Sequence, residues 1–112
     1  MKDLEHGEKL ADTILKNEPG NNFVDERYLW ILDAKAYCLI EAGRFNDALR
    51  TATVLLDRRS NKASNAPSNP LVHERLISAQ TLMARSYVAL DDWSAGCRYF
   101  KGAANHVSAL MN

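Results

Sequence analysis

Apolar residues recur at helical spacing along almost the whole chain, and no stretch alternates polar and apolar residues long enough to predict a strand. The first helical pattern runs from Asp3 to Lys16 and stops before Pro19 and Gly20. A second pattern runs from Asn22 to Ala42 and is apolar around most of its circumference. A helix of this kind needs several neighbours to cover it, so we expect it at the centre of the fold.

A helix breaker and a polar stretch define the next two segments, a third helix and a loop. Gly43 tolerates the positive φ that ends a helix, and a third helix is predicted to begin after Phe45 and to run to residue 58. Residues 59–69 are polar and rich in Ser and Asn, and they bury too little apolar surface to order themselves. We therefore expect a mobile loop there, which could act as a lid.

A cap signal starts the second half of the fold. Asn69 and Pro70 have the residue types of an N-cap and a first helical position, and the predicted fourth helix runs from there to Leu90. A short turn leads into a fifth helix from Ser94 to Leu110. The sequence thus predicts an all-α protein of five helices in one domain, residues 1–112, with an N-terminal helix (1–18), a first hairpin (22–58), a polar loop (59–69) and a second hairpin (70–112).

When Gly43 is set against Asp91, small, large, aromatic and small residues recur in the same order in the first four of six matched pairs of the two hairpins. The matched pairs are Ala36 with Ala84, Leu39 with Tyr87, Phe45 with Trp93, Ala48 with Gly96, Ala52 with Phe100 and Leu55 with Ala103. This order resembles the tetratricopeptide repeat (TPR), a helical hairpin of about 34 residues. The resemblance implies two degenerate units stacked as a short right-handed superhelix, with small residues where helices approach closely.

The resemblance also implies a binding groove. In TPR proteins the first helix of each hairpin lines a concave surface that holds a peptide or a helix of a partner. The corresponding contact residues in this sequence are Trp30, Asp33, Tyr37, Glu41, Ser78, Thr81 and Arg85. Trp, Tyr and Arg are the residue types that dominate binding hot spots. Two alternatives stay open: the first helix could cover Trp30, and Asp33 could pair with Arg85.

Candidate catalytic groups are scarce. The sequence has no glycine-rich phosphate loop, no nucleophile elbow and no HExxH helix. The histidines are dispersed over different helices, which predicts surface positions for His6, His73 and His106. The adjacent Asp91 and Asp92 fit a capping role better than acid/base chemistry. We expect no enzyme, no cofactor and no metal site.

The charge balance and the cysteines narrow the possible functions of the protein further. The 14 basic and 14 acidic residues cancel, whereas a nucleic-acid binder carries a basic surplus. A short basic cluster, Arg58, Arg59 and Lys62, fits a helix end, where cations favour the macrodipole. No apolar run approaches the roughly 20 residues that span a bilayer, and the first ten residues lack the hydrophobic stretch that a signal peptide needs, so we expect neither a membrane span nor a signal peptide. Cys38 and Cys97 lie in apolar patterns, which predicts buried, reduced thiols.

These observations favour a non-catalytic protein interaction module, a scaffold or adaptor within a protein complex. We expect an intracellular protein, cytoplasmic or nuclear, that binds a protein or peptide and neither nucleic acid nor membrane. A short stack leaves an apolar face at its end, here around Val107 and Met111, which could pair with a second copy, another protein or further repeats. The alternative is a regulatory domain whose packing shifts when a peptide or metabolite enters the groove.

Overall fold

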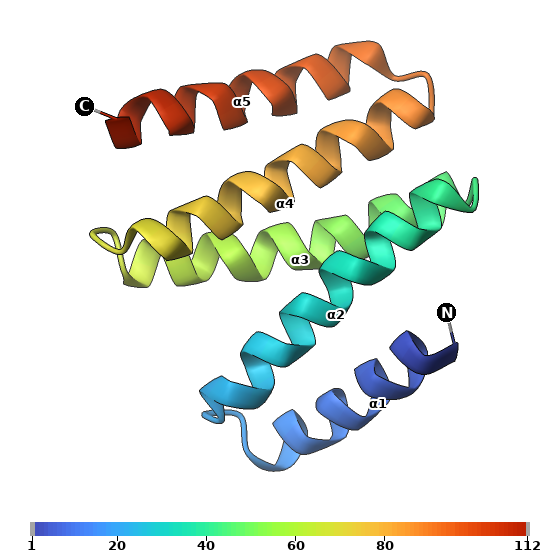
Figure 1. Ribbon diagram of the computed structural model, residues 1–112, viewed down its shortest axis with the longest axis vertical. Coiled ribbons are helices and arrows are strands. Elements are labelled where there is room, and N and C mark those ends of the chain that lie inside the picture. Colours follow the sequence, from blue (N-terminus) through green and yellow to red (C-terminus); the bar gives the residue numbers. More distant parts are fainter. Residues whose placement is uncertain (1, 112) are drawn as a thin grey trace.

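The computed structural model describes residues 2–111 as five α-helices joined by short turns (Figure 1). The helices are α1 (Lys2–Asn17), α2 (Asn22–Glu41), α3 (Phe45–Asn65), α4 (Pro70–Ala89) and α5 (Trp93–Met111). None of these described residues forms a strand. The predicted all-α class and the five helices are confirmed, and only the end of α3 differs from its predicted boundary by more than one residue.

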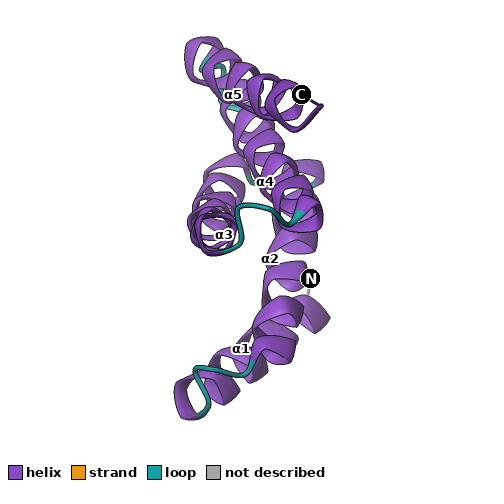
Figure 2. Ribbon diagram, turned by 90° about the vertical axis from the view of Figure 1, so that its left-hand side faces the viewer, coloured by secondary structure: helices purple, strands orange, loops and turns teal. Residues whose placement is uncertain are grey.

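Successive helices run antiparallel and form a row in the order of the sequence (Figure 1). Each helix packs on the next, and α2 also contacts α4. Figure 2 shows α3 displaced to one side of α2 and α4, so that these two helices share the opposite side. The row is a slab of 38 × 36 × 15 Å with α1 and α5 at its ends.

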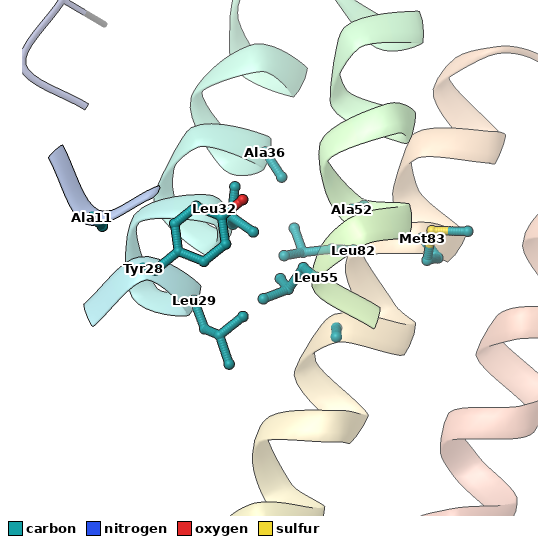
Figure 3. Close-up of a cluster of buried hydrophobic side chains, with 10 residues drawn as sticks. Ala11, Tyr28, Leu29, Leu32, Ala36, Ala52, Leu55, Leu82 and Met83 are labelled. Atoms are coloured by element: carbon teal, nitrogen blue, oxygen red, sulfur yellow. The ribbon is translucent and has the colours of Figure 1, made fainter. Parts of the chain in front are cut away.

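The core lies where α2, α3 and α4 meet (Figure 3). Leu29 and Leu32 of α2 pack with Leu55 of α3 and Leu82 of α4, and none of the four is more than 4% exposed. Burying each such side chain contributes about 1.5–3 kcal/mol of hydrophobic free energy. Ala11 joins this cluster from α1, so the predicted central position of the second helix is confirmed.

The two hairpin turns have the same backbone geometry. Gly43 and Asp91 both have positive φ, at 77° and 63°. The N–H of the following residue donates back to the preceding helix in both turns, from Arg44 to the Leu39 carbonyl and from Asp92 to the Tyr87 carbonyl, each at 2.9 Å. This is the hydrogen-bond pattern of a Schellman cap. The alignment of Gly43 with Asp91 therefore holds in three dimensions.

Small residues stand where paired helices approach most closely. Ala48 and Ala84 are fully buried. A Cβ atom built on Gly96 would lie 2.5 Å from Cγ2 of Val88 and 3.3 Å from the carbonyl oxygen of Ala84. A side chain at Gly96 would therefore force α5 away from α4.

Side-chain caps fix two helix starts as the sequence predicted. Asn69 accepts from the N–H groups of Leu71 and Val72, at 3.1 and 3.4 Å, at the start of α4. Asp92 accepts from the N–H of Ala95 at 3.1 Å, at the start of α5. Each bond satisfies a donor that the first helical turn leaves unpaired. The capping interpretation of Asp92 is confirmed.

The predicted polar loop is helical over most of its length. Helix α3 continues to Asn65, so the first hairpin spans residues 22–65 and only residues 66–69 lead into α4. Arg59 and Ala63 are 4% and 6% exposed, and Lys62 lies 2.8 Å from the Asp25 carboxylate of α2. The prediction was wrong because it counted apolar surface alone, whereas ion pairs to α2 order these turns. Residues 59–65 are part of a packed helix and cannot form a lid.

A substitution at the first turn tests the shared backbone geometry. Gly43→Ala places a Cβ at a φ of 77°, and we expect it to lower the free energy of unfolding by about 1 kcal/mol. Urea unfolding followed by circular dichroism measures this change. The control is Gly20→Ala, because Gly20 has open space around it and no positive φ. Equal effects of the two substitutions would contradict the role of the positive φ.

Candidate binding groove

Exposed and half-buried side chains run in two rows along the neighbouring helices α2 and α4. The row on α2 repeats every three or four residues and comprises Phe23, Arg27, Trp30, Ala34, Tyr37 and Glu41. The row on α4 has the same spacing and comprises Leu71, Glu74, Ser78, Thr81 and Arg85. We call the surface formed by these two rows the groove. It contains a pocket of about 500 Å³, lined by Trp30, Asp33, Ala34, Tyr37, Cys38, Arg59, Glu74, Arg75 and Ser78.

Four of the seven predicted contact residues line this pocket: Trp30, Asp33, Tyr37 and Ser78. Trp30 is 55% exposed and Tyr37 is 49% exposed, so α1 does not cover Trp30 and that alternative is wrong. The guanidinium carbons of Arg75 and Arg27 lie 5.8 and 6.0 Å from the Trp30 ring. Such cation–π contacts contribute about 0.5–1 kcal/mol at exposed sites and help to fix the position of the indole.

The other three predicted residues lie outside the pocket. The Arg85 guanidinium is 4.8 Å from the centre of the Tyr37 ring and 3.9 Å from the Glu41 carboxylate. Thr81 donates at 2.9 Å to a carbonyl one turn earlier in its own helix. Arg85 therefore extends the wall beyond Tyr37, and the alternative pair with Asp33 is absent. The Arg85–Glu41 pair is exposed and contributes little to stability.

A charged junction lies next to the pocket and shares Arg59 and Arg75 with its lining. Arg59 is 4% exposed and donates to both carboxylate oxygens of Glu26, at 3.0 and 3.2 Å. Arg75 of α4 donates to the same carboxylate at 2.9 Å. Lys62 of α3 lies 3.1 Å from it. Glu26 thus connects α2 to both α3 and α4.

The charges of this junction also set the protonation of Glu26. Burial alone would raise the pKa of the Glu26 carboxyl, but hydrogen bonds and positive charges from Arg59 and Lys62 outweigh burial and lower it. The carboxyl is therefore ionised in the folded protein around neutral pH, which keeps the buried Arg59 compensated.

The basic cluster predicted for a helix end pairs with acidic residues of α2. Arg58 lies 2.9 Å from the Asp25 carboxylate, and Arg59 and Lys62 pair with Glu26. The helix continues for more than a turn past Arg58 and Arg59, so the macrodipole interpretation is wrong for these two, whereas Lys62 lies in the last turn of α3 as predicted. One sequence signal could have identified the pairing. Glu26 stands 17 residues before Gly43 and Arg59 stands 16 residues after it, which puts the two side by side in an antiparallel hairpin.

Two carboxylates of the pocket have no partner. Within residues 2–111, neither Asp33 nor Glu74 forms an ion pair or a hydrogen bond through its side chain. Burial raises the pKa of Asp33, and the positive charge of Arg59 opposes this effect only in part. The pocket therefore combines paired arginines with unpaired carboxylates.

Both cysteines are exposed, contrary to the prediction of buried thiols. Cys38 lines the pocket. Cys97 lies on a side of α5 that no described helix covers. The apolar patterns around them belong to faces that the described chain leaves open, which is why these patterns did not indicate burial.

Two of the three histidines lie together, which corrects the prediction that they are dispersed. His73 Nδ1 is 2.9 Å from His106 Nε2, and His73 Nε2 is 2.8 Å from the Pro67 carbonyl oxygen. Because a carbonyl only accepts, Nε2 of His73 carries a proton, and Nδ1 of neutral His73 accepts from His106. Burial and the neighbouring His73 lower the pKa of His106. The pair joins α5 to the start of α4 and does not line the pocket.

Two further features are absent from the part of the chain that the structure describes. Among residues 2–111, no three His, Cys, Asp or Glu side chains are grouped so that they could hold a metal ion. None of the described helices combines the length and the apolar character needed to cross a membrane.

The charged junction predicts a pH-dependent loss of stability. Glu26→Gln leaves the buried Arg59 without its counter-charge, so we expect the free energy of unfolding at neutral pH to fall by about 2–3 kcal/mol. Because the pKa of Glu26 is lowered from 4.5 in the folded state, its contribution is present above that value. The contribution is lost as the pH falls through the lowered pKa.

Urea unfolding of both proteins at neutral and acidic pH measures this difference, which should shrink on acidification. Glu74→Gln is the matched control, because Glu74 has no partner among the described residues and should give a change near zero. Equal losses for the two variants at neutral pH would show that Glu26 has no special role.

Comparisons with protein-family models, curated proteins and solved structures find no match to this chain. The resemblance to the TPR family stays a prediction from the sequence. What the groove does must therefore be inferred from its own geometry.

Proposed function

We propose that this protein is a non-catalytic interaction module, a scaffold or adaptor that holds a segment of a partner protein in the groove between α2 and α4. One observation carries the proposal: two large aromatic side chains, Trp30 and Tyr37, are about half exposed and line the same pocket. Aromatic residues cluster at the centres of binding sites, where a partner completes their burial. An intracellular compartment, cytoplasmic or nuclear, fits a chain with two free thiols.

The shape of the surface supports a peptide or a helix as the occupant. The two rows continue beyond the pocket along both helices, from Phe23 to Glu41 on α2 and from Leu71 to Arg85 on α4. A segment lying along these rows would contact Trp30 and Tyr37 two helical turns apart. The sequence resemblance to TPR proteins supports the same mode of binding.

Peptide selection tests this proposal. Peptides selected from a random phage library on the wild-type protein should lose about tenfold or more in affinity for Trp30→Ala and Tyr37→Ala, because each change removes a large buried contact. Fluorescence polarisation with labelled peptides measures the affinities.

Trp93→Ala is the control, because Trp93 is 61% exposed and lies on α5, away from the pocket. Circular dichroism checks that each variant stays folded. Peptides that bind the wild type and the two groove variants equally well would contradict the proposal.

A second surface supports self-association through α5. The exposed row Trp93, Cys97, Phe100, Ala104, Val107 and Met111 has the alternating four-and-three spacing of a coiled-coil seam. When Gly43 is set against Asp91, Phe100 and Met111 correspond to Ala52 and Ala63 of α3. Helix α4 packs on α3, and there Ala52 is fully buried and Ala63 is 6% exposed. In α5, Phe100 and Met111 at the same positions are 41% and 82% exposed. A second copy packing on α5 would cover this row.

Sedimentation velocity over a wide range of concentrations tests the self-association. We expect a concentration-dependent dimer that Phe100→Glu and Val107→Glu weaken by about tenfold or more, because each variant places a charge in an apolar interface. Val54→Glu is the control, since Val54 is 44% exposed on α3 and lies outside the row. A wild-type monomer at every concentration would refute the dimer and leave the groove unaffected.

A further inference from the structure

The hydrogen-bonding capacity of the pocket is uneven. Its two arginines, Arg59 and Arg75, already donate to the Glu26 carboxylate at 3.0 and 2.9 Å. Its two carboxylates, Asp33 and Glu74, have no ion-pair or hydrogen-bond partner within residues 2–111. A group that enters the pocket therefore meets carboxylates that are free to accept and guanidinium groups that are already engaged. This arrangement favours a donor with a positive charge.

The walls of the pocket suit the apolar part of such a donor. Trp30, Ala34 and Tyr37 supply an apolar side along α2. Lysine and arginine bury their methylene stems against surfaces of this kind while the charged head reaches a polar partner. The rings of Trp30 and Tyr37 already contact Arg75 and Arg85, at 5.8 and 4.8 Å. The entering stem therefore packs against the exposed parts of Trp30 and Tyr37.

We propose that the pocket receives a lysine or arginine side chain of the partner segment, whose charged head pairs with Asp33 and Glu74. This inference rests on the proposed function of the groove and specifies the chemistry of its occupant. A cation beside Asp33 offsets the cost of keeping a half-buried carboxylate ionised, which the raised pKa of Asp33 reflects. An acidic side chain in the same place would meet two like charges.

Blocked amino acids provide a direct test, because only their side chains are charged. The probes are N-acetyl-arginine methylamide, N-acetyl-lysine methylamide, the norleucine analogue and the glutamate analogue, added at constant ionic strength to the 15N-labelled chain. We expect the arginine and lysine probes to shift the NMR signals of the Trp30 indole N–H and the Asp33 amide. The norleucine probe should bind at least about fivefold more weakly, because it has the stem without the charge. The Trp93 indole should not move.

Variants of the two carboxylates test whether Asp33 and Glu74 bind the charged head of the probe. Asp33→Asn and Glu74→Gln should each lower the affinity for the arginine probe by about fivefold or more, because each removes one carboxylate from the pocket. Asp57→Asn is the matched control, since Asp57 is exposed on α3 and does not line the pocket.

Three results would overturn this inference. They are equal affinity for the norleucine and arginine probes, unchanged affinity in both pocket variants, and no shift at Trp30 with any probe well above millimolar concentration. The peptide selection described above is independent of these probes. Selected peptides that need Trp30 and Tyr37 but contain no basic residue would leave the groove in place and refute only the proposed occupant.

Discussion

The Glu26 carboxylate is the contact on which the arrangement of the three central helices depends. It accepts from Arg59 of α3 and from Arg75 of α4, while its own backbone belongs to α2. A guanidinium as buried as that of Arg59 is costly unless an anion compensates it, so the carboxylate stabilises this arrangement of the three helices. Apolar packing around Leu29 and Leu55 supplies most of the driving force, but it is less directional.

The same carboxylate shapes the groove. Arg59 forms part of the pocket, and Arg75 both pairs with Glu26 and lies beside the Trp30 ring. The position of the exposed indole is therefore linked to the buried junction through one side chain. The charged residues of the pocket divide accordingly into arginines that support the fold and carboxylates that remain available.

Much of the fold could be predicted from the sequence because its determinants are local. Helical spacing indicated the five helices, and the cap at Asn69 and the glycine at Gly43 indicated their ends within one residue. The match of Asp91 to Gly43 came from the order of residue sizes along each of the two hairpins. Such features depend on residues a few positions apart in the sequence, so the pattern along the chain is enough to predict them.

The errors concern contacts between distant residues. The pairs Arg59–Glu26 and His73–His106 each join residues 33 positions apart, so the residues around one partner do not indicate the other. For the first pair, only the positions of both residues relative to Gly43 could have indicated the contact. The prediction of the pocket was incomplete for the same reason. Trp30 and Tyr37 followed from the repeat pattern, whereas Glu74 and Arg75 enter it only because α4 packs against α2. Whether an apolar stripe is covered also depends on a neighbouring helix, as the exposed Cys97 shows.

The row of helices has a consequence for the way the molecule opens. Helix α1 packs on α2 alone, and α5 packs on α4 alone, whereas the three middle helices contact one another. Within the described residues, each end helix can therefore detach while the other keeps its contacts, and we expect local unfolding to begin at these two helices. A partner that bridges α2 and α4 protects the middle of the row and leaves the end helices free to exchange. Occupancy of the groove and order at the ends are thus separate properties of this chain.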